Sequence, residues 1–438
     1  MRASRNAAVT FLLDRSVTLT PTRVPEAVPD TGGNRLRLVL VLGAFIALGP
    51  LTIDLYLPAL PTITGELLTT SATVQLTLTG TLLGLGLGQL VIGPLSDRFG
   101  RRRPLIAGAA VHVLASLLCI IAPNVAVLGG LRVLQGLGAA AGSVIAMAIV
   151  RDLYTGRAAA TLLSRLILVM GTAPVLAPTF GAWLLAFTSW RGVFAVLALY
   201  SLLLMPIAAR ALPETLPPHR RQTSGIAGTL RTYRGLLRDR TFVGLILVAG
   251  LAMSAVMSYV SGASFVFQEQ FGLNQQQFGL AFSSGAIWLI LASQLNPVLL
   301  RRFEPRQLLL GAIAMAAVAS LLMVAVAVSG VGGLFGLLLP LWLVLLSVGF
   351  GLPNAPAVAL SGYGETAGTA AALLGATQFG VGALISPMVG VLGNDAIAMS
   401  IAIAGGLVLS LLVLVLVVRP WRLPDVDPVV GALAAAEA

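Results

Sequence analysis

Twelve long apolar runs divide the 438-residue sequence and account for most of it. A helix needs about 20 mostly apolar residues to cross the hydrocarbon core of a bilayer, and each run is close to that length. Lipid offers no hydrogen-bond partners to the backbone, so the runs are expected to be helical. The sequence therefore predicts an all-α membrane protein with twelve transmembrane helices, at residues 36–60, 72–95, 104–122, 125–150, 160–186, 191–209, 241–267, 277–300, 307–328, 333–360, 367–392 and 396–418.

Charged residues are too scarce for a water-soluble protein. They make up 10% of the chain, against about 25% in soluble domains, and the mean hydropathy is +0.96. A soluble enzyme and a disordered chain are excluded. All 27 basic residues are arginine, so neither a Walker A lysine nor a Schiff-base lysine exists. One cysteine, Cys119, and two distant histidines argue against a metal site, and no cofactor is expected.

The arginines are distributed asymmetrically across the twelve runs. All but two of the 27 fall on the side of the membrane that carries both termini; the exceptions are Arg132 and Arg191. The positive-inside rule therefore predicts that both termini are cytoplasmic. This pattern also explains the net charge of +11. Because no basic patch is interleaved with base-stacking aromatic residues, no nucleic-acid partner is expected.

The longest loop, 210–240, contains three prolines and divides the runs into six and six. Gly88-Gln89-Leu90 near the end of the second run is echoed by Ser293-Gln294-Leu295 near the end of the eighth. Such echoes favour two pseudo-symmetric six-helix bundles that rock against each other. The expected organisation is a cytoplasmic tail (1–35), a first bundle (36–209), a cytoplasmic linker (210–240), a second bundle (241–418) and a cytoplasmic tail (419–438).

Two charged residues lie deep in the predicted membrane region. Asp54 is about 10 Å and Arg132 about 12 Å from the side opposite the termini, at 1.5 Å per residue. The matching depths predict a shared polar cavity, in which Asp54 takes up and releases a proton; a static ion pair is the alternative. Desolvation favours the neutral carboxyl group, whereas a nearby guanidinium favours the charged one. His112, in the third run, either relays protons or packs between helices.

Prolines interrupt the run that contains Asp54. Pro50 and Pro58 lie on either side of it, and Pro353 and Pro356 flank Asn354 in the tenth run. Proline removes a backbone hydrogen bond and bends a helix, and the freed carbonyl groups need protein or water as partners. The first run is therefore expected to line a cavity.

The stretch from Gly93 to Arg103, Gly-Pro-Leu-Ser-Asp-Arg-Phe-Gly-Arg-Arg-Arg, resembles the signature between the second and third spans of the major facilitator superfamily. The resemblance covers about residues 36–418 and implies that fold. It implies that Asp97 faces the start of the eleventh span and that Arg101 pairs with Asp152. The inner-gate residues implied by the resemblance are Gly93, Asp97, Arg98, Gly100, Arg101, Arg102 and Asp152.

Three further stretches resemble motifs of particular branches. Leu131–Gly136, with Arg132, resembles the fourth-span motif of proton-coupled members. The stretch 171–181 is similar to the antiporter motif, although Ala177 and Ala182 stand where glycine is common. Asp54–Pro61 resembles the first-span signature of the bicyclomycin-resistance (Bcr/CflA) drug-efflux subfamily. The antiporter-motif residues so implied are Gly171, Pro174, Pro178 and Gly181.

These resemblances imply proton/drug antiport out of a bacterial cytoplasm, across the inner membrane. The expected proton-coupling residues are Asp54, Arg132 and His112. The expected substrate-lining residues are Asp54, Tyr56, Gln75, Arg132, Gln135 and Asn354. A mostly apolar site with few polar groups suits lipophilic small molecules, and a monomer is the expected state. Three alternatives remain open: a transporter of a metabolite or sugar, a membrane-embedded enzyme and a passive channel.

Overall fold

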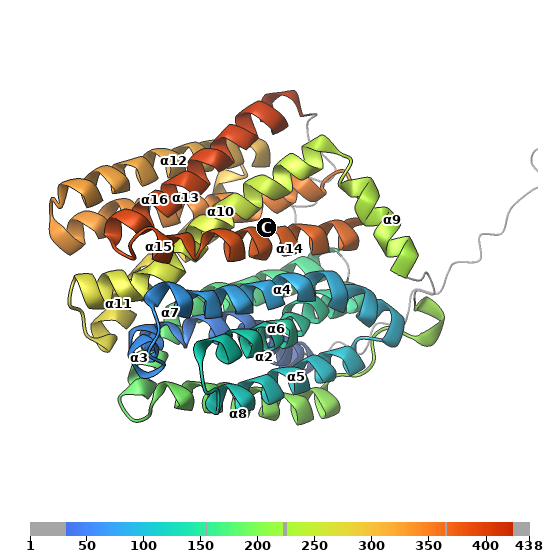
Figure 1. The fold of residues 1–438 in the computed structure, drawn as a ribbon. Helices are drawn as coiled ribbons and strands as arrows, with labels where there is room; N and C mark the ends of the chain where they lie inside the picture. Colours follow the sequence, from blue (N-terminus) through green and yellow to red (C-terminus); the bar gives the residue numbers. More distant parts are fainter. Residues whose placement is uncertain (1–31, 155, 222–225, 364–365, 424–438) are drawn as a thin grey trace, which may run out of the picture. The chain divides into compact units, whose positions relative to one another are not determined.

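A computed structural model describes residues 32–154, 156–221, 226–363 and 366–423. Within these ranges the regular secondary structure is entirely helical (Figure 1). Twelve helical stretches are long and apolar enough to cross a membrane, and each coincides with one predicted run. The predicted all-α, twelve-span class is confirmed. Most of both predicted tails, 1–31 and 424–438, lies outside the described residues.

The spans are built from the following elements: α2 (Gly32–Asp54), η1 (Leu57–Ala59), α3 (Leu60–Glu66), α4 (Ser71–Phe99), α5 (Arg102–Ile120), α6 (Val125–Leu153), α7 (Gly156–Leu185), α8 (Trp190–Ala211), α10 (Arg240–Phe265), η3 (Val266–Gln270), α11 (Gln275–Leu299), α12 (Pro305–Ser329), α13 (Gly333–Leu360), α14 (Ala367–Ile385), α15 (Met388–Val391), α16 (Ala396–Val413) and η5 (Leu414–Val418). The segment between the sixth and seventh spans adds η2 (Pro218–Arg220) and α9 (Ile226–Leu236), and η6 (Pro420–Arg422) follows the last span.

Local sequence explains two of the short turns between spans. Asn124 ends the turn before α6, and its side chain accepts a hydrogen bond from the Val127 nitrogen at 2.9 Å. Gly330 and Gly332, in the turn between α12 and α13, have φ angles of 68° and 76°. Only glycine adopts this left-handed conformation readily, so the glycine-rich sequence permits the tight reversal.

The compact unit Arg37–Ala438 contains two bundles of six spans. They meet through two helix pairs, α4 with α14 and α7 with α11. These are the second and eleventh spans and the fifth and eighth. A pseudo-twofold axis that exchanges the bundles converts one pair into the other, so the contacts agree with the predicted parallel repeat.

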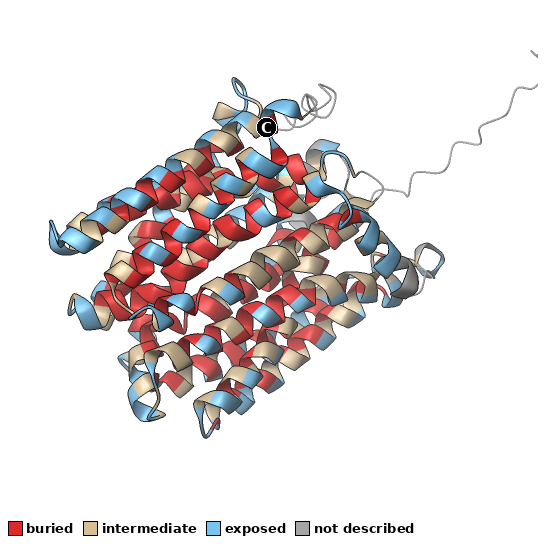
Figure 2. Ribbon diagram, turned by 45° about the horizontal axis from the view of Figure 1, so that its top comes forward, coloured by how far each residue is buried: buried red, intermediate tan, exposed pale blue. Residues whose placement is uncertain are grey.

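Glycines allow helices within a bundle to approach closely. A Cβ atom on Gly84 of α4 would lie 2.1 Å from the Val133 carbonyl oxygen, and one on Gly136 of α6 would lie 2.1 Å from that of Thr81. The glycine runs of these spans therefore serve helix packing. Figure 2 shows buried residues where helices face one another. Large apolar side chains such as Leu202 and Leu321 are exposed, as lipid contact requires.

Candidate functional site

The first span is broken at Asp54. Helix α2 ends at this residue, and Leu55 and Tyr56 form a turn, with Tyr56 in the right-handed helical region, before η1 begins at Leu57. Pro50 lies inside α2 and Pro58 in the first turn of η1, as the sequence predicts for an interrupted span. A Cβ atom on Gly181 of α7 would lie 2.3 Å from the Leu55 carbonyl oxygen. The fifth span therefore packs directly against the backbone of the first span beside Asp54.

Asp54 is buried but has no polar partner among the described residues. Its side chain is 4% exposed, and none of the described groups forms a hydrogen bond or ion pair with it. Three residues later, the Leu57 carbonyl oxygen accepts from the Ser264 hydroxyl of α10, in the second bundle, at 2.8 Å. Asp54 therefore lies close to where the first bundle meets the second.

Arg132 of α6 is fully buried inside the first bundle. Its Nη1 donates to the Thr52 carbonyl oxygen at 3.0 Å and to Gln135 Oε1 at 2.6 Å. Its guanidinium lies over the rings of Tyr56 and Phe194, 4.6 and 5.7 Å from their centroids, a cation–π arrangement. Nε and Nη2 have no partner within the described part of the chain. The charge is thus held by carbonyl, amide and aromatic groups rather than by a carboxylate.

A chain of hydrogen bonds continues from Arg132 to His112. Gln135 Nε2 donates to the Ser116 hydroxyl at 2.7 Å. His112 Nε2 lies 2.9 Å from Thr52 Oγ1 and Nδ1 lies 2.7 Å from Ser201 Oγ. The Thr52 hydroxyl already donates to a carbonyl one turn earlier, at 2.6 Å. Thr52 Oγ1 therefore accepts from His112 Nε2, which places a proton on that ring nitrogen.

Asp54 and Arg132, which are expected to share a cavity, form no hydrogen bond or ion pair with each other among the described residues. Thr52 and Tyr56, two residues before and after Asp54, both contact Arg132. Two residues along a helix correspond to a rotation of about 200°, which places Asp54 on the side of the span away from these contacts. That Asp54 and Arg132 line one cavity stays a prediction.

The residues expected to line one substrate site lie in three places. Tyr56 and Gln135 join Arg132 in the first bundle. Gln75 Nε2 donates to Asn394 Oδ1 at 2.5 Å, between the bundles near the side opposite the termini. Asn354 Nδ2 donates to Asn296 Oδ1 at 2.7 Å within the second bundle. That these residues line one substrate site stays a prediction.

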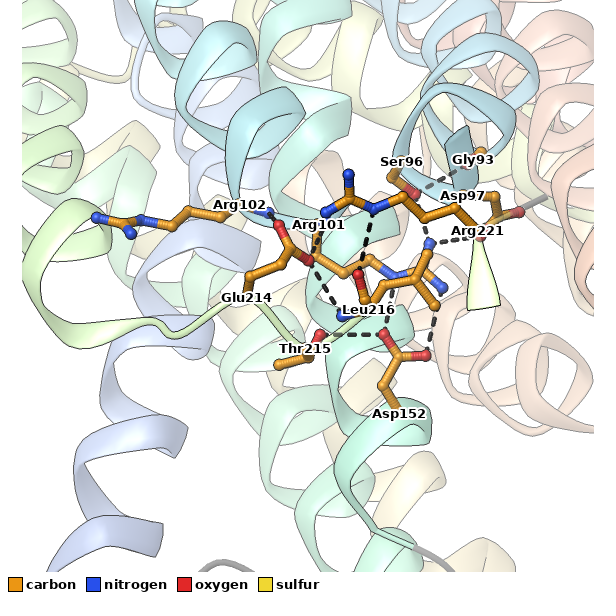
Figure 3. A network of polar contacts seen from close by, with 10 residues as sticks. All are labelled: Gly93, Ser96, Asp97, Arg101, Arg102, Asp152, Glu214, Thr215, Leu216 and Arg221. Atoms are coloured by element: carbon orange, nitrogen blue, oxygen red, sulfur yellow. Dashed lines mark hydrogen bonds and ion pairs between the residues drawn. The ribbon is translucent and has the colours of Figure 1, made fainter. Parts of the chain in front are cut away.

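The loop between the second and third spans carries a cluster of ionic contacts (Figure 3). Arg101 Nε donates to Asp152 Oδ2 at 2.8 Å, the pairing implied by the resemblance, and Nη1 donates to Asp97 Oδ1 at 2.5 Å. Nη1 also donates to the Ser96 hydroxyl at 2.8 Å. Burial lowers the pKa of Arg101, but the hydrogen bonds to Asp152 and Asp97 outweigh it and raise the pKa overall. Arg101 therefore stays charged between α4 and α6.

Glu214, which follows the sixth span, completes this cluster and was not anticipated from the sequence. Its carboxylate accepts from the backbone nitrogen atoms of Arg101 at 2.7 Å and Arg102 at 3.3 Å. The hydroxyl of Thr215 donates to Asp152 Oδ2 at 3.0 Å. Figure 3 shows this segment lying against the loop. The sequence shows Glu214 as an isolated acidic residue among prolines and arginines, but it does not indicate which groups its carboxylate contacts.

The other inner-gate residues have local contacts. The Arg98 guanidinium lies 5.2 Å from the centre of the Phe99 ring. Arg102 donates through Nη2 to the Ala209 carbonyl oxygen. The Gly93 carbonyl oxygen accepts from Ser96 Oγ at 2.8 Å. That Asp97 faces the start of the eleventh span stays a prediction.

In the antiporter stretch, Pro174 and Pro178 lie inside α7. A Cβ atom on Gly171 would lie 3.4 Å from Ile290 of α11. Gly171 and Gly181 thus mark where the fifth span contacts the second bundle and the first span, respectively.

Hydrogen bonds join the two bundles near the side opposite the termini. Besides Gln75 and Asn394, the Ser264 hydroxyl donates to the Leu57 carbonyl oxygen at 2.8 Å. A Cβ atom on Gly390 of α15 would lie 2.7 Å from Ala72 Cα of α4, so the backbones are in close contact there. These contacts close this side of the junction between the bundles. No cluster of three or more His, Cys, Asp or Glu side chains occurs among the described residues.

Two six-span bundles that meet at two helix pairs, with a charged cluster at one end, define a membrane transporter. The chain belongs to the Major Facilitator Superfamily, whose family model matches residues 40–387.

Curated relatives cover most of the chain. An uncharacterized MFS-type transporter of Bacillus subtilis, YdgK, is 36% identical over 84% of this chain and 92% of its own length. A chloramphenicol resistance protein of Pseudomonas aeruginosa is 33% identical over 79% and 83%. A bicyclomycin resistance protein homolog of Haemophilus influenzae is 28% identical over 82% and 90%. The chain is thus similar to drug-resistance members of the superfamily.

Solved structures share the fold. A D-xylose-proton symporter has a TM-score of 0.68 at 17% identity, covering 90% of this chain and 98% of that one. A bacterial homolog of the human lysosomal transporter Spinster has a TM-score of 0.65 at 17% identity, covering 93% and 98%. At this identity the likeness concerns the fold alone.

Proposed function

We propose that this transporter is a proton-coupled exporter of lipophilic small molecules. It exchanges protons for substrate across a bacterial inner membrane, with both termini in the cytoplasm, and works as a monomer. The names of the chloramphenicol- and bicyclomycin-resistance relatives support the substrate class. The concentration of arginine on the terminus side supports the orientation.

The observation that carries the proposal is the unpaired, buried carboxyl group of Asp54 at the junction of the bundles. An ionised carboxylate without a partner is costly away from water, so the closed junction suits the protonated form. Ionised Asp54 favours a hydrated, open junction. Protons and substrate compete for this junction. They are therefore exchanged across the membrane as the junction opens to one side and then to the other.

Arg132 connects the proton site to the interior of the first bundle. It contacts the Thr52 carbonyl group before the break and the Tyr56 ring after it. A movement of the first span at Asp54 therefore changes the contacts of Arg132. His112 holds Thr52 from the other side, and both of its nitrogens are hydrogen-bonded here. In this mechanism Arg132 and His112 stabilise the position of the first span, and their contacts change when that span moves.

The cluster around Arg101 acts as the gate on the cytoplasmic side. Arg101 holds the end of α4 through Asp97 and the end of α6 through Asp152. These charge-assisted contacts are strong when aligned and are lost when the helix ends separate. These contacts form in one state of the transporter and break in the other, so the two states are stabilised by different interactions.

Transport assays on proteoliposomes test the proposal. With an imposed pH gradient, a fluorescent lipophilic drug should exchange against protons, and a protonophore should stop the exchange. Drug movement that ignores both the gradient and the protonophore would contradict proton coupling. A susceptibility panel in an efflux-deficient host would then identify the drugs.

A further inference from the structure

Helix α9 lies between the sixth and seventh spans and is attached to both bundles. Leu236 is 5% exposed and packs in a cluster with Phe242 and Leu374 of the second bundle. The Tyr233 hydroxyl donates to the Leu90 carbonyl oxygen of α4, in the first bundle, at 3.4 Å. Figure 1 shows α9 beside the terminus-side end of α14, which it contacts. One side of α9 is therefore fixed to the protein at the membrane surface.

The other side of α9 combines exposed leucines with arginines. Leu230 is 66% and Leu237 52% exposed, and Arg231, Arg234 and Arg238 are also exposed. At about 100° per residue these five positions fall within roughly one third of the helix circumference, when the helix is continued by two residues. No described side chain pairs with the three guanidinium groups.

Asp239, the carboxylate nearest to α9 in the sequence, already has partners. Asp239 accepts from the Tyr363 hydroxyl and from the backbone nitrogen atoms of Thr241 and Phe242. The hydrogen bond from Tyr363 lowers the pKa of Asp239, with smaller contributions from the two backbone groups. Asp239 therefore caps α10 and leaves the arginines of α9 available.

We propose that this face of α9 binds the headgroups of anionic phospholipids. The guanidinium groups of Arg231, Arg234 and Arg238 match phosphate oxygens in geometry and charge. Leu230 and Leu237 insert at the boundary between headgroups and acyl chains, as in helices that lie in the membrane interface. Water would leave both leucines exposed, whereas a lipid surface satisfies leucines and arginines together. Lipids bound there lie next to both bundles, because α9 contacts each of them.

The test uses the full-length chain in nanodiscs. Gly235 is exposed, and a Cβ atom there has nothing within 4 Å, so G235C provides a labelling site. Cys119 is buried and does not compete for the label. A bimane dye on G235C is quenched by headgroup-spin-labelled phosphatidylglycerol or by the matched phosphatidylcholine analogue. We expect quenching at several-fold lower mole fractions of phosphatidylglycerol, with a preference that weakens as salt rises.

Variants separate lipid recognition from general proximity to the bilayer. Each of R231Q, R234Q and R238Q should reduce the phosphatidylglycerol preference about fivefold at low salt. The control R301Q/R302Q, which removes exposed arginines from the same side of the protein, should retain it. L230S/L237S should weaken quenching by both analogues. Equal quenching by the two lipids, or an unchanged preference in a variant that combines R231Q, R234Q and R238Q, would overturn the proposal. Quenching by neither lipid would also overturn it and point to a protein partner.

Discussion

The carboxylate of Glu214 lies 2.7 Å from the backbone nitrogen of Arg101, 113 positions earlier in the chain. Arg101 is the N-cap residue of α5, and its own side chain does not cap the helix. The first amide groups of a helix lack internal partners and attract negative charge. Glu214 therefore supplies the cap from a distant segment and attaches the start of the linker to the gate.

Gly100 makes this contact possible, and its replacement should be costly. It has a φ angle of 89° and a ψ angle of 169°, a conformation open almost only to glycine. A Cβ atom would lie 2.4 Å from Glu214 Oε2. We expect G100A to lose about 1–3 kcal/mol of stability from the backbone conformation alone, measured as loss of the monodisperse peak after heating. In G93A, where a Cβ atom meets nothing within 4 Å, stability should be unchanged or higher; equal losses in both variants would refute this account.

Removing the gate arginine should slow turnover more than it weakens binding. R101A leaves Asp97 and Asp152 without their shared partner and removes contacts that differ between states. We expect transport to fall at least about tenfold, which corresponds to about 1.4 kcal/mol, while drug affinity changes little. R103A is the matched control because Arg103 is exposed in the first turn of α5, two residues after Arg101. Unchanged turnover in R101A would exclude the gate role.

Asp54 should be required for coupling and not for folding. D54N keeps the size of the side chain and remains neutral at every pH, so the protein should insert normally but lose exchange driven by the pH gradient. Substrate counterflow without a gradient should persist. E269Q changes an exposed carboxylate at the end of the seventh span and should transport normally. Full gradient-driven exchange by D54N would eliminate the proposed proton site.

The hydrogen bonds of Arg132 should contribute strongly to stability. Q135L removes the amide oxygen that accepts from Arg132 and the donor to Ser116. A buried charged group that loses a partner costs about 1–3 kcal/mol or more. We therefore expect earlier unfolding on heating and reduced transport. The neighbouring substitution L134M, on a side chain 47% exposed toward lipid, should leave both unchanged; the same stability for Q135L and L134M would show that the network is unimportant.

Sequence reasoning succeeded where the determining physics is local. The ends of the twelve spans lie within a few residues of the predicted runs, apart from extensions such as the first span to Glu66. The thickness of the hydrocarbon core limits each run independently of its neighbours. The pairing of Arg101 with Asp152 followed from a recognised motif at the ends of consecutive helices.

Tertiary structure alone decided which side chains meet. Depth along a helix can be counted from the sequence, but rotation about the helix axis depends on packing against segments far away in the chain. Thr52 and Tyr56 thus contact Arg132 while no described group pairs with Asp54, and Asn354 pairs with Asn296 while Gln75 pairs with Asn394. Glu214 shows the same limit, because a carboxylate in a loop can cap any helix that the fold brings near. By itself the sequence determined a twelve-span transporter with charges at set depths; the packing of its helices determined which of those charges are paired, which are isolated, and on which side of the junction each one lies.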